Sequence, residues 1–154
     1  MDDSFRLLFV CTGNICRSPM AEGLMKVLLP RGAGRHIIIR SAGTHAADGL
    51  PAEPGAARAA REHGADIGGH RSRAIDGSVI ATASLILVME KQQARFIHGT
   101  APVARDALRL LGEFAGGEGN PEIPDPYGGS LTEYRHCAQM IRGCLDGVID
   151  FIRQ

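Results

Sequence analysis

The sequence predicts an α/β domain in three layers, with a four-stranded parallel sheet between helices on both of its faces. Short apolar runs alternate with longer segments of helical periodicity along the whole chain. With 154 residues, of which 44% are hydrophobic and 22% charged, the chain is long enough to bury one sizeable core. We therefore expect one domain over residues 1–154, with its ligand site beyond the carboxyl ends of the strands.

The first half of the chain contains two units of a strand followed by a helix. Residues 6–11 form an apolar run that is typical of a buried strand, and a proline opens the helix predicted over 19–29. The isoleucine-rich residues 36–41 predict the second strand. An alanine-rich helix over 54–63 follows, and the glycine after it suits the end of a helix.

The second half of the chain continues the alternation. In order, we predict a helix over 74–83, a strand over 84–89, a short helix over 91–98, a strand over 107–111, a loop over 112–129 and a closing helix over 131–152. One apolar stripe marks the closing helix as a core element: Cys137, Met140, Ile141, Cys144, Leu145, Val148 and Ile152. The loop before it is unusually long, and loops of that length are commonly functional or disordered.

The balance of charges excludes several kinds of partner. Lys and Arg together equal Asp and Glu at 17 each, so no overall positive field is present to attract nucleic acid or a membrane surface. The apolar run at residues 7–10 is too short for a signal sequence or a membrane span. We therefore expect a cytoplasmic monomer with no nucleic-acid or membrane partner.

The cysteines indicate neither a disulfide framework nor a metal site. The chain has four, which is too few and too uneven a set for a small secreted domain. Cys11 and Cys16 have no matching pair of Cys or His nearby, as a zinc site would need. We expect reduced thiols, and no metal or other cofactor.

The segment that carries chemistry is the loop over residues 11–19, between the first strand and the first helix. Unpaired N–H groups at a helix N-terminus, together with the helix dipole, suit such a loop to an oxyanion such as phosphate. In that field the thiol of Cys11 is expected to be available as a thiolate, which is a nucleophile. Arg17 can place two N–H donors on the same oxyanion.

Three further loop residues have expected structural roles. Ser18 can donate a hydrogen bond to the sulfur of Cys11. Gly13 is expected to supply a backbone conformation that other residues resist, and Asn14 tolerates a positive φ while its side chain ties the loop together.

A second candidate group is Asp125, which lies between two prolines. Pro124 and Pro126 stiffen the backbone on either side and can hold the carboxylate in a fixed direction. An acidic residue beside proline is also common in plain surface turns, so the local sequence leaves both interpretations open.

The string Val-Cys-Thr-Gly-Asn-Ile-Cys-Arg-Ser-Pro over residues 10–19 closely resembles the signature of low molecular weight protein tyrosine phosphatases. Three other segments resemble landmarks of that family and occur in the same order: Ser-Ala-Gly-Thr at 41–44, His-Arg-Ser-Arg at 70–73 and Asp-Pro-Tyr-Gly at 125–128. The position of Gly128, where animal members have a second tyrosine, is similar to the bacterial branch.

The resemblance implies a role for each matching residue. Cys11 would attack phosphorus and become a phosphocysteine, while Arg17 and the amides of Thr12, Gly13, Asn14, Ile15 and Cys16 hold the phosphate oxygens. Asp125 would protonate the leaving phenol and then activate the water that cleaves the intermediate. Asn14, Ser18, Ser41 and His70 match the hydrogen-bond network that supports the loop.

The other cysteines distinguish between related activities. In the family, Cys16 would be the reversible disulfide partner of Cys11, and simple packing is its alternative. Arsenate reductases of related fold share the loop signature and use additional cysteines. Cys137 and Cys144 lie seven residues apart on one predicted helix, or about 10.5 Å along its axis, which is beyond disulfide reach. We interpret them as core residues.

Substrate preference depends on the walls of the cleft. Tyr127 is placed to form one aromatic wall, whereas Ala47 stands near the place where many relatives have a bulky residue. Ile15 replaces the threonine of a sister branch that acts on phosphoarginine, which favours phosphotyrosine. The expected partners are phosphotyrosine proteins, a bacterial tyrosine autokinase among them. The alternatives are a protein arginine phosphatase, an arsenate reductase and a noncatalytic phosphate-binding module.

Overall fold

The computed structural model describes residues 3–29 and 35–154. Its sheet has four strands in the order β2-β1-β3-β4, and every neighbouring pair is parallel. The strands are β1 (Phe5–Cys11), β2 (Ile37–Gly43), β3 (Leu85–Val88) and β4 (Leu108–Leu110). This confirms the predicted α/β fold with a four-stranded parallel sheet.

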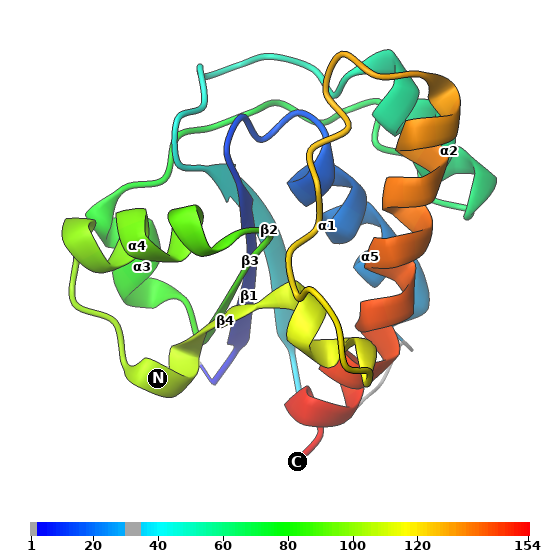
Figure 1. Ribbon diagram of the computed structural model, residues 1–154. Helices are drawn as coiled ribbons and strands as arrows, with labels where there is room; N and C mark the ends of the chain where they lie inside the picture. The colour runs from blue at the N-terminus through cyan, green and yellow to red at the C-terminus, as the bar shows by residue number, and fades with distance from the viewer. Residues whose placement is uncertain (1–2, 30–34) are drawn as a thin grey trace.

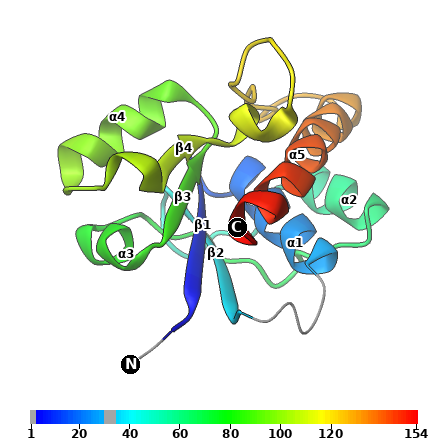
Figure 2. The ribbon, with the colours of Figure 1, turned by 90° about the horizontal axis from the view of Figure 1, so that it is seen from below.

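Helices cover both faces of the sheet (Figures 1 and 2). The helices are α1 (Arg17–Leu28), α2 (Pro54–Glu62), α3 (Gly77–Thr82), α4 (Lys91–Thr100) and α5 (Leu131–Ile152), with short 3₁₀ segments η1 (Arg105–Ala107) and η2 (Leu111–Ala115). One hydrophobic core joins the sheet to α1, α2 and α5, and a second core on the opposite face joins it to α3 and α4. The three predicted layers are therefore present.

The ends of several elements differ from the prediction. Helix α1 begins at Arg17 instead of residue 19, because its proline lies within the first turn, where the missing N–H has no intrahelical partner to lose. Helix α3 begins only at Gly77, since the side chain of Asp76 caps the helix at the N–H of Val79 and Ala74 pairs with the end of β2. The predicted loop over 112–129 begins with part of η2.

The closing helix is the element that the sequence described best. Of the seven residues in the predicted stripe, six are buried, and Met140 is partly exposed. Cys137 and Cys144 are both buried, as expected of core residues. Among residues 3–29 and 35–154, no helix is long and apolar enough to cross a membrane.

Candidate active site

The loop between β1 and α1 lies at the carboxyl edge of the sheet, where β1 is flanked by β2 on one side and β3 on the other. Ligands of open α/β sheets bind at such a point, because neighbouring connections leave in opposite directions. A cavity of about 240 Å³ opens there, lined by Cys11, Thr12, Gly13, Ile15, Cys16, Arg17, Asp125 and Tyr127. The cavity joins the loop to residues more than a hundred positions later in the chain.

The sulfur of Cys11, which lines this cavity, has two hydrogen-bond contacts. The N–H of Asn14 donates to Sγ at 3.3 Å, and the hydroxyl of Ser18 lies 2.9 Å from it. Cys11 is 2% exposed, so both contacts are shielded from water. The main-chain N–H of Asn14 is thus directed at the sulfur of the predicted nucleophile.

Asn14 holds the loop in shape through all of its polar groups. It has a φ of 57° and is fully buried. Its Nδ2 donates to Ser18 at 2.8 Å and to Ser41 at 3.0 Å, while Oδ1 accepts from the N–H of Arg73 at 2.9 Å. Nε2 of His70 lies 2.6 Å from the Asn14 carbonyl oxygen, and because a carbonyl only accepts, this nitrogen is the donor.

The supporting network extends one residue further than the sequence indicated. The hydroxyl of Ser41 donates to Glu22 Oε1 at 2.7 Å, so its own hydrogen is used while it accepts from Asn14. Glu22 lies on α1, one helical turn after the loop ends. The four expected residues Asn14, Ser18, Ser41 and His70 are thus brought together, with Glu22 as an additional member.

Arg17 is 1% exposed, and its guanidinium is held by three groups from later in the chain. Nη1 donates to Glu90 and, at 2.7 Å, to the carbonyl oxygen of Ile123. Nη2 lies 3.7 Å from Asp125 Oδ2. Glu90 was not expected from the sequence, although its position two residues after β3, at the carboxyl edge of the sheet, is a signal that could have identified it.

The carboxylate of Asp125 stands at the mouth of the cavity. Oδ1 accepts the N–H of Tyr127 at 3.1 Å, a local turn that fixes the side chain, while the side chain as a whole is 47% exposed. The preceding segment is anchored by the N–H of Ile123, which donates to Met89 at the end of β3. One carboxyl oxygen therefore faces Arg17 and the cavity while the other is held by its own loop.

Gln93 is a second residue that the sequence analysis missed. Its Nε2 donates to the hydroxyl of Thr12 at 3.2 Å, and its Oε1 accepts from the N–H groups of Met89 and Glu90. It is buried and is the third residue of α4. Gln93 therefore links the start of α4 to the loop that holds Cys11. Its contact with Glu90 is part of a local capping box, whereas its contact with Thr12 joins segments 81 residues apart, which no local pattern predicts.

The expected role of Gly13 is wrong. Gly13 has no positive φ, and a Cβ there would meet only Ile15, at 3.6 Å, which is ordinary contact. The positive φ belongs to Asn14. The glycine that the loop requires is Gly43, where a Cβ would lie 2.5 Å from the carbonyl oxygen of Thr12.

Cys16 is buried beside Tyr134, with Sγ 3.7 Å from the phenolic oxygen. Burial raises the pKa of the Cys16 thiol to about 12, so it stays protonated at neutral pH. Cys11 and Cys16 are both free thiols in the structure. The expected reversible disulfide between them stays a prediction.

The two predicted wall residues have different positions. Tyr127 lines the cavity and is 63% exposed, whereas Ala47 is not among the residues that line it. Ala47 is exposed, and its carbonyl oxygen accepts a hydrogen bond from the hydroxyl of Ser72. Ile15 faces the same cavity as Tyr127 and supplies further apolar surface.

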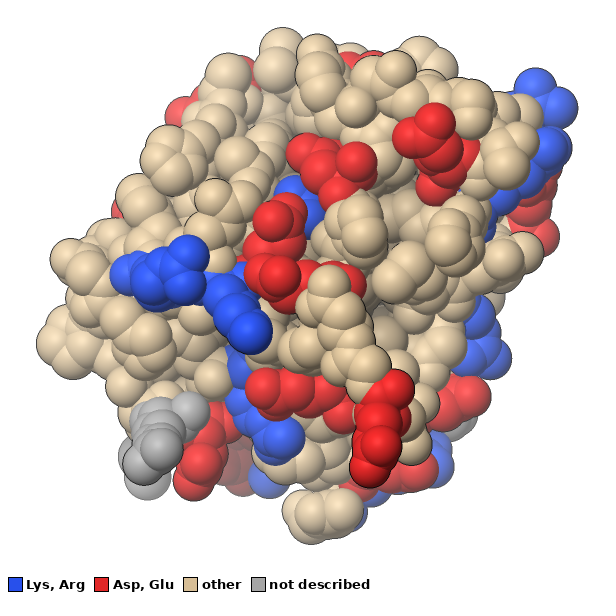
Figure 3. Space-filling view, viewed as in Figure 1, with Lys and Arg blue, Asp and Glu red and all other residues tan. Residues whose placement is uncertain are grey.

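The outer surface near the cavity carries negative charge. Acidic side chains gather near the centre of the face shown in Figure 3, between α4 and α5. The positive charge that attracts an oxyanion must therefore come from inside the cavity, from Arg17 and the loop amides. Among the described residues, no group of three or more His, Cys, Asp or Glu side chains could hold a metal ion.

Comparisons with known proteins show what the whole chain is similar to. The family model described as low molecular weight phosphotyrosine protein phosphatase matches residues 6–153. The chain is 37% identical over 147 residues to a probable low molecular weight protein-tyrosine-phosphatase, EpsP, of Ralstonia nicotianae, covering 96% of this chain and 95% of that one.

Solved structures from two kinds of phosphatase are similar to the chain. A low molecular weight protein tyrosine phosphatase from T. tengcongensis is 36% identical, with a TM-score of 0.85 over 96% of this chain and 99% of that chain. The YwlE arginine phosphatase from Geobacillus stearothermophilus is 32% identical, with a TM-score of 0.85 over 96% of this chain and 92% of that chain. The sequence identity and the TM-score are therefore nearly the same for a tyrosine phosphatase and for an arginine phosphatase.

Proposed function

Since the chain belongs to the low molecular weight phosphotyrosine protein phosphatase family, we propose that it hydrolyses protein phosphotyrosine through a phosphocysteine on Cys11. Members of this family are hydrolases. The observation that carries the proposal is that Cys11, Arg17 and Asp125 line one cavity. A nucleophile, an oxyanion clamp and a proton donor are the three groups that the reaction needs.

In the first step the thiolate of Cys11 attacks phosphorus. The S–P bond forms while the bond from phosphorus to the phenolic oxygen breaks, and Asp125, as the acid, gives its proton to that oxygen. Glu90 and the Ile123 carbonyl hold Nη1 of Arg17, which leaves other N–H groups of the guanidinium to bind the phosphoryl oxygens. The free tyrosine then leaves.

In the second step water cleaves the phosphocysteine. Asp125, now a carboxylate, takes a proton from the water as its oxygen bonds to phosphorus, and the S–P bond breaks. The departing thiolate accepts hydrogen bonds from the hydroxyl of Ser18 and the N–H of Asn14. The same carboxyl group thus serves both steps and returns to its starting state.

The apolar surface of the cavity supports an aromatic substrate. Ile15 and Tyr127 flank the entrance above Cys11, and a ring between them would bring its phosphate to the loop. The similarity to YwlE arginine phosphatase makes phosphoarginine the second candidate. Ile15 favours the aromatic ester over the more polar guanidino group, because burying polar N–H groups against its side chain is unfavourable.

The remaining thiols argue against an arsenate reductase. Burial raises the pKa of Cys137 to about 12 and that of Cys144 to about 11, so neither provides a ready thiolate for exchange. We also propose that residues 1–154 act as one cytoplasmic, monomeric phosphatase domain without a metal or cofactor. Its partners would be phosphotyrosine proteins, including a bacterial tyrosine autokinase.

The decisive experiment measures phosphate release from peptides that carry phosphotyrosine, phosphoarginine or phosphoserine, in EDTA and reductant. We expect turnover with phosphotyrosine, none with Cys11→Ser, and retained turnover with Cys144→Ala, which removes a buried thiol outside the cavity. Faster release from phosphoarginine would establish the second candidate. No release from any peptide would overturn the phosphatase proposal, and thiol consumption with arsenate would then test the reductase.

A further inference from the structure

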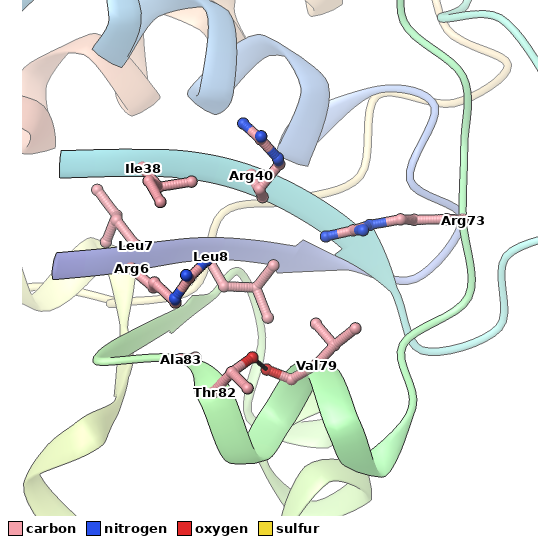
Figure 4. Close-up of a pocket in the computed structure, with 9 residues that line it drawn as sticks. All are labelled: Arg6, Leu7, Leu8, Ile38, Arg40, Arg73, Val79, Thr82 and Ala83. Carbon is pink, nitrogen blue, oxygen red and sulfur yellow. Dashed lines mark hydrogen bonds between the residues drawn. The ribbon is translucent and has the colours of Figure 1, made fainter. Parts of the chain in front are cut away.

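A second cavity, of about 180 Å³, lies on the other face of the sheet between β2 and α3 (Figure 4). Its apolar walls include Leu8, Ile38 and Val79. Three arginines also line it: Arg6, Arg40 and Arg73. None of the described residues that line this cavity is acidic.

The cavity is open because the helices on this face do not extend over β2. The core under α3 and α4 takes its strand residues mainly from β1, β3 and β4. β2 is an edge strand, and on this side Ile38 is only half-buried while Arg40 is exposed. Figure 4 shows Val79 on α3 facing the strands and Arg73 extending towards the end of β2. A groove with an apolar floor and a basic rim results.

No acidic group among residues 3–29 and 35–154 forms an ion pair with Arg40 or Arg73. Nη1 of Arg40 donates to the carbonyl oxygen of Ile39 at 3.0 Å, and Nε of Arg73 donates to that of Ser41 at 3.1 Å. Each guanidinium has five N–H groups, so most of its donors stay available. Within the described part of the chain, neither arginine forms an ion pair with a carboxylate. Four other arginines do: Arg17, Arg109, Arg135 and Arg142.

We infer that this cavity binds a small molecule that carries one carboxylate or phosphate group on an apolar body of about one aromatic ring. Guanidinium groups match such oxyanions in a bidentate geometry, and a charge-assisted hydrogen bond is about twice as strong as a neutral one. A cavity of roughly 150 Å³ accommodates benzene, so this one is large enough for a single ring. Ile38 and Val79 would contact the ring while Arg40 and Arg73 hold the anion.

The cavity is connected to the loop that holds Cys11. The main-chain N–H of Arg73 donates to Asn14, and its side chain donates to the carbonyl of Ser41, whose hydroxyl accepts from Asn14. A ligand that draws the Arg73 guanidinium away from Ser41 therefore acts on two neighbours of Asn14. Because coupling between two sites is reciprocal, a phosphate in the loop would change affinity in the cavity by the same factor.

The test is a titration of the ¹⁵N-labelled protein with benzoate, followed through amide chemical shifts. We expect the largest changes at residues 38–41 and 79–83. Arg40→Gln should weaken the affinity at least about tenfold, since one charged donor is lost. Arg61→Gln, which removes an exposed arginine of α2 on the far face of the sheet, should leave it unchanged. Phenylphosphonate in parallel compares the two anionic groups at the same amides.

Two outcomes would overturn the inference. Amide chemical-shift changes confined to residues 11–17 would mean that benzoate binds only in the loop that holds Cys11. Equal affinity of Arg40→Gln and wild type for benzoate would mean that the arginines only protect the edge of the sheet from pairing. The connection has its own measurement, the affinity for inorganic phosphate at saturating benzoate. A change of at least about twofold in wild type but not in Arg40→Gln is expected, and no change in wild type would contradict the coupling.

Discussion

Arg17 obtains its counter-charge from a residue 73 positions away in the chain. A buried guanidinium must be neutralised inside the protein, since leaving one partner of a buried ion pair unmatched costs several kcal/mol. Glu90 does this while the side chain itself stays mostly enclosed, at 24% exposed. The ion pair between Arg17 and Glu90 is therefore also a structural contact between α1 and the start of α4.

Replacing Glu90 should reveal this structural role. We expect Glu90→Ala to lower the free energy of unfolding by about 3 kcal/mol, because the buried charge of Arg17 is left with only the half-exposed Asp125 carboxylate, 3.7 Å away, as its partner. The control is Glu113→Ala, which breaks an ion pair with Arg109 that is exposed on both sides and should cost less than about 1 kcal/mol. Urea denaturation of both variants gives the comparison. Equal losses would show that Arg17 does not depend on Glu90.

The loss of kcat on replacing Asp125 should be larger for a more basic leaving group. We expect Asp125→Asn to reduce kcat for a phosphotyrosine peptide by about 100-fold or more, because the phenolate would leave without a proton. Para-nitrophenyl phosphate has a far more acidic leaving group and should lose much less. The amide can still accept the N–H of Tyr127, so the loop is retained. The same loss with both substrates would contradict a general-acid role.

At the scale of residues, the local sequence was enough to predict the residues of the loop, but not the distant residues that contact them. Cys11, Arg17 and Ser18 lie within eight residues, so one motif and its place after a strand were enough to identify them. Glu90 and Gln93 were missed because their contacts depend on how two strands are placed side by side. Gly13 was misjudged because a glycine in a tight loop was assumed to need a positive φ, which belongs to Asn14 instead.

At the scale of elements, one glycine of α5 allows η2 to pack closely against this helix. Gly147 allows the carbonyl oxygen of Phe114 to approach, and a Cβ on it would lie 2.5 Å from that oxygen. Gly143, one turn earlier, has nothing within 4 Å of the same position. The two glycines lie on the same helix but differ in their surroundings. Substitution of Gly143 therefore measures helix propensity alone, whereas substitution of Gly147 also measures the effect of packing against η2.

Substitution of these two glycines by alanine should have opposite effects. Gly143→Ala is expected to raise the free energy of unfolding by about 0.5–1 kcal/mol, because alanine loses less backbone entropy in a helix. Gly147→Ala should lower it by about 1–3 kcal/mol, since η2 must move away. Thermal unfolding under identical conditions checks both. A stabilising effect at Gly147 would mean that η2 gives way at little cost.

The existence of the elements was predicted better than their ends. Apolar runs and helical stripes are repeated signals, which is why all four strands were found. The start of α3 depended on a single capping contact, from Asp76 to the N–H of Val79. The first residues of the predicted helix, 74–76, lie outside α3, and Ala74 instead forms a bridge with Gly43 at the end of β2. That pairing joins distant segments and leaves no periodic pattern.

For the molecule as a whole, burial of three thiols makes stability depend on pH. Burial raises the pKa of Cys16 and Cys137 to about 12 and that of Cys144 to about 11, from an ordinary value near 9.0. Below pH 9 the thiols are protonated in both states and have no effect. Above it the unfolded chain loses these protons first, so stability falls as pH rises, until the native thiols ionise near pH 11–12.

Each thiol contributes at most about 1.4 kcal/mol per pH unit to this fall. We expect the urea midpoint to decline between pH 9 and pH 11, and that of Cys144→Ala to decline less steeply because one of the three groups is removed. The comparison of slopes, rather than of absolute stability, isolates the titration from the packing change. Identical slopes in the two proteins would show that the buried thiols do not control alkaline stability.

The arrangement of the strands in the sheet could be predicted only in part from the sequence. Alternating strands and helices predict parallel pairing, but the order β2-β1-β3-β4 follows from which face each crossover takes. That order places the loop after β1 beside the residues that follow β3. The resemblance to a family supplied what the pattern alone could not, namely that residues near 11, 41, 70 and 125 meet at one edge.

The enclosure of Arg17 also has a consequence for how the chain folds. Its contacts with Glu90 and Ile123 span 73 and 106 residues, so they require the closure of long loops, which slows folding. A refolding chain that has formed its helices and strand pairs still lacks these contacts of Arg17 until the distant segments dock. During refolding, enzyme activity should therefore recover later than the far-ultraviolet circular dichroism of the helices. Enzyme activity then indicates when folding is complete.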